Sequence, residues 1–140
     1  NDTAGSMAKD SMFNAAAVVR RMTGKELSDY DVNINFVGGG NIDGPSAGCA
    51  ITTALISAIT GKPVRQDMAL TGEISIQGQV KPVGGVFEKA YGARQAGMKG
   101  IIIPKENAHD IPERHLGLDI HYAVTIDDVL KLMLVEQEGA

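Results

Sequence analysis

The chain has 140 residues, of which 44% are hydrophobic and 21% are charged, and its formal net charge is −4. This composition is sufficient for one globular domain with its own core, and the single cysteine, Cys49, excludes an internal disulfide framework. The acidic balance does not suggest a nucleic-acid-binding domain, and no apolar run approaches the length of a membrane span.

The first third of the chain predicts a helix, a strand and a glycine-rich loop. Residues 1–6 are small and polar, and they predict a loop that ends in a helix cap at Ser6. Apolar residues then recur at helical spacing over residues 7–23. Apolar and polar residues alternate over residues 31–37, which predicts a half-buried strand, and a glycine-rich loop follows over residues 38–46.

The rest of the chain predicts helices and strands in alternation. Small and apolar residues occur nearly all round residues 47–60, so we expect a buried helix there. Residues 68–80 have strand character, with Ile74 and Ile76 on one face and interruptions at Gly72 and Gly78. The remaining predicted elements are a helix over residues 86–96, a fully buried strand over 100–104, a strand over 118–124, and a last helix that runs from the capping pair Thr125 and Asp128 to near Val135. The pattern favours a single α/β or α+β domain, with mixed sheet segments packed against about four helices.

Ser46 is the first candidate for chemistry, because it stands between Gly44-Pro45 and the predicted buried helix. A helix N-terminus offers free N–H groups and a partial positive charge, which together can stabilise a developing oxyanion. Taken alone, a serine before a helix is more often an N-cap than a nucleophile, so both interpretations stay open at this point.

Lys89 is the second candidate, since helical spacing places it on one stripe with Val86, Ala90, Ala93 and Ala96. In a desolvated pocket the pKa of a lysine falls below its reference value of about 10.4, and a neutral amine can take the proton of a serine hydroxyl. In the alternative interpretation, the side-chain stem lies along the edge of the core and the ammonium reaches water.

The histidines and the cysteine offer weaker alternatives. A serine–histidine pair would need His109, His115 or His121, which we expect on a surface turn over residues 105–110, in a loop, and on the outward face of a strand. Cys49 lies one turn into the predicted buried helix, where we expect it to pack. The three histidines have no metal-ligand spacing, and the chain lacks the phosphate-loop motif that binds ATP.

Several sequence motifs resemble those of Lon proteases. Residues 43–48 (DGPSAG) resemble the catalytic-serine motif of that family, and residues 70–74 (LTGEI) and 84–89 (GGVFEK) resemble the two motifs that follow it. Residues 103–107 (IPKEN) match a further segment of the family. The resemblance runs from about residue 3 to about residue 135, and several motifs in the same order make it specific.

The resemblance implies the Lon proteolytic-domain fold and an endopeptidase with Ser46 as nucleophile and Lys89 as general base. It also implies that Thr71 hydrogen-bonds Lys89, and that Asp43 shapes the serine loop and offers its backbone N–H to the oxyanion. It implies no cofactor or metal in this domain. ATP and Mg are expected only at a separate AAA+ ATPase module of the same protein.

The resemblance further implies polypeptide substrates, a homohexameric ring and a cytoplasmic location, with any membrane association carried by other segments of the full protein. We expect residues 1–140 to form the proteolytic domain, without its N-terminal strands and without the AAA+ module. One alternative is a Lon-like fold that lacks protease activity, although such relatives usually lack the serine and the lysine. Another is an esterase-like hydrolase that pairs Ser46 with a histidine.

Overall fold

The computed structural model describes residues 2–26, 47–112 and 117–136. The strand predicted over residues 31–37, the glycine-rich loop over 38–46 and His115 lie outside the described residues. In chain order the elements are α1 (Asp2–Thr23), α2 (Gly48–Thr60), β1 (Met68–Leu70), β2 (Glu73–Ile74), β3 (Val80–Lys81), α3 (Val86–Gln95), β4 (Gly100–Pro104), the 3-10 helix η3 (Lys105–Asp110), β5 (Asp119–Ala123) and α4 (Ile126–Met133).

The strands form two small sheets. β1, β4 and β5 make a parallel sheet in the order β1-β4-β5, in which Leu70 is opposite Ile102 and Ile102 is opposite His121. β2 and β3 make an antiparallel pair in which Ile74 is opposite Val80. Parallel strands need crossover connections, and α3 lies on the crossover from β1 to β4. The predicted mixture of helices and sheet segments in one small domain is confirmed.

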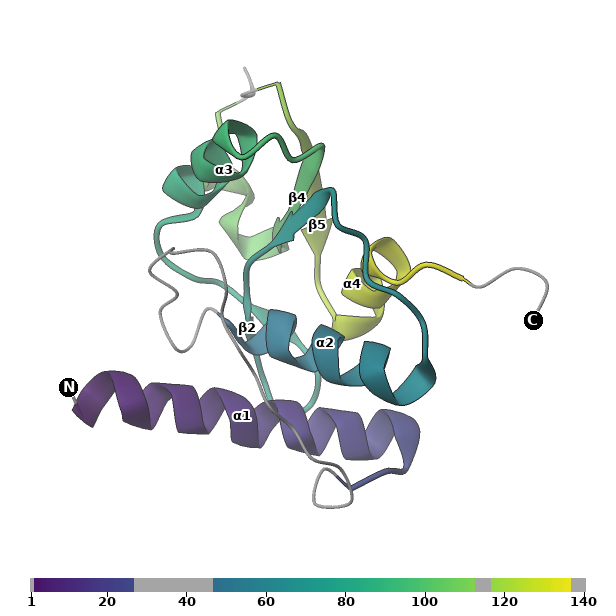
Figure 1. Cartoon of the computed structure of the whole chain (residues 1–140). Coiled ribbons are helices and arrows are strands. Elements are labelled where there is room, and N and C mark those ends of the chain that lie inside the picture. The colour runs from purple at the N-terminus through teal and green to yellow at the C-terminus, as the bar shows by residue number, and fades with distance from the viewer. Residues whose placement is uncertain (1, 27–46, 113–116, 137–140) are drawn as a thin grey trace.

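The central strand β4 is buried on both faces, and its side chains alternate between two parts of the core. Ile102 packs with Cys49 of α2 and Val129 of α4. Ile101 and Ile103 point the other way and pack with α3. Figure 1 shows α3 and α4 on opposite sides of the sheet. A strand covered on both faces needs apolar side chains at successive positions, which explains the run of three isoleucines.

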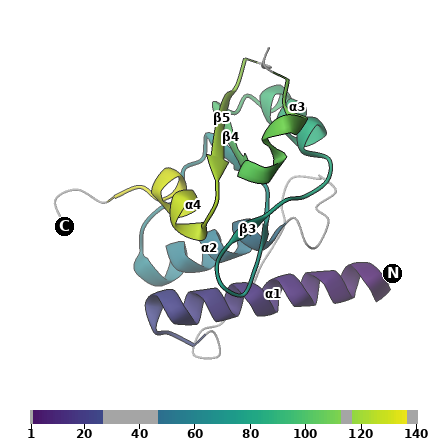
Figure 2. The ribbon, with the colours of Figure 1, turned by 180° about the vertical axis from the view of Figure 1, so that it is seen from behind.

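Helices α1 and α2 lie side by side along one end of the domain (Figures 1 and 2). Ala15 and Val19 of α1 pack against Ile51 and Leu55 of α2 in a cluster of buried side chains. The prediction that residues 1–6 form a loop was wrong, because α1 already begins at Asp2. Serine and threonine disfavour a helix interior by less than about 1 kcal/mol each, so local polarity does not prevent the longer helix.

Two further predictions in the middle of the chain need correction. The helix over residues 47–60 is not buried all round, because Ala54 and Ala58 are exposed on the side of α2 that faces away from the core. Ile76 does not share a buried face with Ile74, because it is 42% exposed in the turn between β2 and β3. The Ser75 N–H donates to the Gln79 carbonyl across this turn, so the chain reverses before the strand alternation can continue.

Helix α1 holds the β2–β3 turn through two side chains. Asn14 Nδ2 donates to the Ile74 carbonyl at 3.1 Å, and Arg21 Nη1 donates to the Ile76 carbonyl at 3.0 Å. Both contacts join residues more than fifty positions apart in the sequence. Hence α1 is attached to the rest of the domain by hydrogen bonds as well as by its apolar face.

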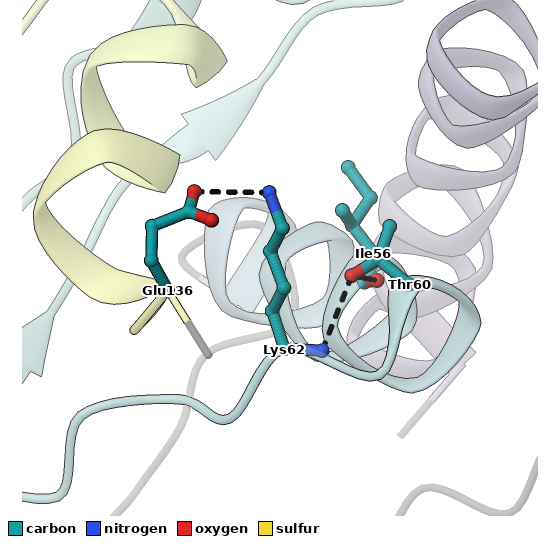
Figure 3. A network of polar contacts seen from close by, with 4 residues as sticks. All are labelled: Ile56, Thr60, Lys62 and Glu136. Carbon is teal, nitrogen blue, oxygen red and sulfur yellow. Dashed lines mark hydrogen bonds and ion pairs between the residues drawn. The ribbon is translucent and has the colours of Figure 1, made fainter. Parts of the chain in front are cut away.

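The last described residues are attached beside the end of α2. Lys62 Nζ lies 3.0 Å from Glu136 Oε1, and the Lys62 N–H donates to Thr60 Oγ1, whose hydroxyl donates to the Ile56 carbonyl (Figure 3). The Val135 N–H donates to the Pro63 carbonyl at 2.8 Å. The predicted capping box at the start of α4 is present, although α4 ends at Met133 and not near Val135. In the part of the chain that the structure describes, no helix combines the length and the apolar character needed to cross a membrane.

Candidate active site

Thr71 directly follows β1 and is held in place by the parallel sheet. Its backbone N–H donates to the Ile102 carbonyl at 3.1 Å, which extends the pairing of β1 with β4 by one residue. The Thr71 side chain is buried, with a relative exposure of 4% for the residue. The carboxyl ends of the strands in a parallel sheet are where ligands commonly bind in α/β folds, so Thr71 lies at a favourable edge for a functional site.

Lys89 lies in the first turn of α3, directly after the loop that contains Gly84 and Gly85. Gly85 has a φ of +69°, a left-handed conformation that favours glycine, and its carbonyl accepts the Lys89 backbone N–H at 3.0 Å. The Lys89 side chain is half-buried, and its Nζ donates to Thr71 Oγ1 and to the Gly84 carbonyl, at 3.3 Å each. The structure therefore brings together two of the four residues that the sequence singled out.

Three of the five residues predicted to form the apolar stripe on α3 are buried. Val86, Ala90 and Ala93 are buried against the sheet, while Lys89 is half-buried and Ala96 is exposed at the end of the helix. Lys89 thus projects from the margin of the buried stripe toward Thr71, and its amine meets oxygen atoms at the edge of the domain.

The start of α2 is packed against the segment that follows Thr71. The Cys49 backbone N–H donates to the Gly72 carbonyl at 3.1 Å. A Cβ added to Gly48 would lie 2.8 Å from the Ile74 nitrogen, so only glycine allows this close approach of two backbones. Ser46 and Asp43 precede this helix in the sequence and lie outside the described residues. Their catalytic roles, and the distance from Ser46 to Lys89, remain predictions.

Cys49 is a packed thiol and not an available nucleophile. It is fully buried, and its Sγ lies 3.7 Å from the Glu73 carbonyl. Burial, with a smaller contribution from the negative charge of Glu73, raises the pKa of the Cys49 thiol to about 12. A thiol attacks as its thiolate, so Cys49 is unreactive near neutral pH.

The two described histidines belong to different elements of the fold. His109 is on η3, with its side chain 77% exposed and its Nε2 3.3 Å from Asp110 Oδ1. His121 is on β5 and half-buried, so its predicted outward position holds only in part. Among the described residues, no group of three or more His, Cys, Asp or Glu side chains is placed to hold a metal ion.

Sequence reasoning missed a buried amide next to the Lys89 loop. The polar run over residues 105–110, predicted as a surface turn, is the 3-10 helix η3, and its Asn107 is buried. Asn107 Oδ1 accepts the Val83 N–H at 2.9 Å, and Nδ2 donates to the Val83 carbonyl at 2.9 Å. A polar side chain can be buried when its hydrogen-bonding groups are satisfied in this way. The family-like segment over residues 103–107 contained Asn107 but gave no indication of this contact.

Comparison with known proteins agrees with the sequence motifs. Residues 3–136 match the model of the Lon protease (S16) C-terminal proteolytic domain, and the chain belongs to this family. It is 48% identical over 130 residues to Lon protease 2 of Bacillus subtilis, and 40% identical over 138 residues to an archaeal Lon protease of Pyrococcus abyssi. It is also 49% identical over 98 residues to the mitochondrial Lon protease homolog of Drosophila melanogaster.

These relatives are much longer than the chain described here. The matched regions cover 93%, 96% and 67% of this chain, but only 23%, 14% and 10% of the Bacillus, Pyrococcus and Drosophila proteins, respectively. The family relationship therefore concerns one part of each relative.

Proposed function

We propose that the chain is the peptidase part of a Lon-type protease, with Ser46 as nucleophile and Lys89 as general base. The observation that supports this best is the pair of oxygen atoms around the Lys89 amine, Thr71 Oγ1 and the Gly84 carbonyl. A neutral amine has two N–H donors and one lone pair. When the donors point at these two oxygens, the lone pair is directed away from both and can accept the Ser46 proton.

The proposed reaction has two stages. The Ser46 proton moves to Lys89 Nζ while Ser46 Oγ forms a bond to the scissile carbonyl carbon. Lys89 then gives this proton to the departing amine nitrogen, the C–N bond breaks, and an acyl-enzyme remains. A water molecule that is deprotonated by Lys89 attacks the ester carbon, and Ser46 leaves with the proton from Lys89. Thr71 acts by holding the amine in position throughout.

Stabilisation of the oxyanion is assigned in this proposal to the start of α2 and to the backbone N–H of Asp43. The first turn of α2 contains no acidic residue, and its first residues are buried. The first turn of α2 therefore adds no carboxylate of its own to the helix start, whose partial positive charge is only partly screened by water and is opposed by the Glu73 carboxylate that also acts on Cys49.

The test uses the intact protein that carries this domain and a fluorogenic peptide. We expect kcat to fall by on the order of 10³-fold or more in each of three variants, Ser46→Ala, Lys89→Gln and Lys89→Arg. The first removes the nucleophile and the second removes the base. The third replaces the base with a guanidinium, which stays charged at any usable pH. Activity of the wild type should rise with pH as Lys89 loses its proton. Unchanged thermal unfolding of the variants is the control. A Lys89→Arg variant with an unchanged rate would exclude Lys89 as the base, and His109, His115 and His121 should then be replaced together.

We also propose the wider assembly that the family suggests. An AAA+ module of the same protein, using ATP and Mg, would deliver unfolded or regulatory polypeptides to a cytoplasmic homohexameric ring. The support is the family membership and the greater length of the relatives. Sedimentation of the full-length protein with ATP should give a hexamer, and a monomer under these conditions would contradict the ring.

A further inference from the structure

The loop between β3 and α3 has a sequence that leaves it little backbone support of its own. β3 ends at Lys81 and α3 begins at Val86, so residues 82–85 (PVGG) connect them. Pro82 has no N–H to donate, and the two glycines lose more conformational freedom on ordering than other residues. Yet this loop carries the Gly84 carbonyl, which, with Thr71 Oγ1, is one of the two oxygens in the described part of the chain that accept from the Lys89 amine.

Asn107 supplies the hydrogen bonds that a neighbouring strand would otherwise give. Its amide binds both backbone groups of Val83, with Oδ1 accepting the N–H and Nδ2 donating to the carbonyl. These are the two bonds that a residue exchanges with its partner in an antiparallel ladder. The contact joins η3 to the loop across 24 positions of sequence, and the residue that it holds, Val83, directly precedes Gly84.

Asp110 sets the orientation of the Asn107 amide. Asn107 Nδ2 also donates to Asp110 Oδ2 at 2.7 Å. An ionised carboxylate only accepts hydrogen bonds, so the NH₂ side of the amide must face Asp110 and the oxygen must face the Val83 N–H. If the amide were reversed, its oxygen would face the Asp110 carboxylate oxygen and its NH₂ group would face the Val83 N–H, and neither pair can form a hydrogen bond.

Thr71 Oγ1 and the Gly84 carbonyl, the two described oxygens that accept from the Lys89 amine, are therefore anchored by different means. Thr71 is fixed by the sheet, through its backbone bond to Ile102. The Gly84 carbonyl follows directly after Val83, whose backbone is fixed by the Asn107 side chain. We propose that Asn107, oriented by Asp110, is a positioning residue that aims the Lys89 amine through the Gly84 carbonyl. This inference rests on the proposed role of Lys89 as general base.

The experiment compares Asn107→Ala with Val129→Ala in the intact protein, using a fluorogenic peptide at a temperature at which both variants are folded. Val129 is fully buried in the core around α4, in a different cluster of buried side chains from the one against which Val83 of the Lys89 loop packs, so its truncation lowers stability away from that loop. Asn107→Ala should lower kcat by on the order of 10-fold to 100-fold with KM within about twofold, because a small misplacement of a catalytic group is costly. Val129→Ala should lower the unfolding temperature and leave kcat close to that of the wild type.

Asp110→Ala is the second variant, and it decides the question if Asn107→Ala does not fold. The Asp110 side chain is 38% exposed, so its removal leaves the core intact. We expect a fall in kcat in the same direction but smaller than that of Asn107→Ala, with KM unchanged. Equal kcat losses for Asn107→Ala and Val129→Ala, or an unchanged kcat for Asp110→Ala, would overturn the positioning role. Active Ser46→Ala or Lys89→Arg variants would instead overturn the proposed function on which it rests.

Discussion

The two helices next to the candidate site begin in opposite surroundings. α2 begins in the core, where Ala47 and Cys49 are buried and Gly48 lies against the backbone of Ile74. α3 begins closer to the surface, because Val86 is buried but the two glycines before it and Phe87 and Glu88 after it are exposed. Neither helix start has a side-chain cap among the described residues, whereas α4, whose start lies beside the β2–β3 turn, has a complete capping box.

The difference separates two ways of holding a functional group. The start of α2 is fixed by direct contact between backbones, which leaves no room for a side chain and does not depend on a particular polar residue. The start of α3 is fixed through side chains, with Thr71 on one side of the Lys89 amine and the Asn107-supported loop on the other. We therefore expect the α2 side to respond to changes in size, and the α3 side to respond to the loss of single hydrogen bonds.

The largest effect is expected on the α3 side. Thr71→Val keeps the shape of the side chain but removes the oxygen that accepts the Lys89 amine, so kcat should fall by on the order of 10-fold to 100-fold. Thr71→Ser, which retains the hydroxyl, is the matched control and should keep most of the activity. Steady-state kinetics of the intact protein measure both. If the valine variant were as active as the serine variant, the Thr71 hydrogen bond would have no role in the reaction.

The next effect is expected on the α2 side. Gly48→Ala places a Cβ 2.8 Å from the Ile74 nitrogen, and backbone must move to relieve the clash. Overpacking of this kind costs about 1–3 kcal/mol, so the free energy of unfolding should fall. Gly92→Ala is the control within α3, because no atom of the described residues outside its own helix lies within 4 Å of the added Cβ. It should raise the free energy of unfolding by up to about 1 kcal/mol. Equal effects of the two variants in chemical denaturation would remove the distinction between the helix starts.

The smallest effect is expected at the capped helix α4. The backbone N–H groups of Val124 and Thr125 hold the pKa of Asp128 below its usual value of 3.8. A carboxylate with a lowered pKa stabilises the fold above its unfolded pKa, and this stabilisation is lost as the pH falls through the folded pKa. Asp128→Ala should therefore cost about 1 kcal/mol at neutral pH, and the difference from the wild type should shrink below pH 3.8. A difference that stays constant into strong acid would contradict the charged cap.

Local sequence signals predicted the elements whose causes are local. The capping pair Thr125 and Asp128, the buried isoleucines of β4 and the stripe on α3 each follow from spacing within one segment. The Thr71–Lys89 hydrogen bond was expected from the family resemblance and is present, while its catalytic meaning stays a prediction. Ser46 and Asp43 lie outside the described residues, so the roles of these two residues stay predictions.

Contacts between distant segments could not be predicted in this way. Ile76 was placed on one face with Ile74, and Gly78 was predicted only as an interruption, because alternation alone does not show that the chain reverses there; Gly78 has a φ of +88° and Ile76 is exposed in the turn. Asn14 and Asn107 look like ordinary polar residues in the sequence, and their importance appears only when the backbone groups that they bind are brought to them by the fold. An asparagine can be buried when it has a hydrogen-bond partner, and a local sequence pattern cannot predict a partner from a distant segment.

The attachment of the last described residues to the end of α2 has a consequence for the order of folding. The Lys62–Glu136 contact closes a loop of 74 residues that contains every strand of both sheets and the whole of α3. The entropic cost of closing such a loop grows only with the logarithm of its length, but the contact cannot form before residue 136 exists. During synthesis on the ribosome, α1 and α2 can pair early, whereas the parallel sheet must await β4 and β5. The Lys89 loop therefore reaches its final geometry only after η3, which carries Asn107, has left the exit tunnel.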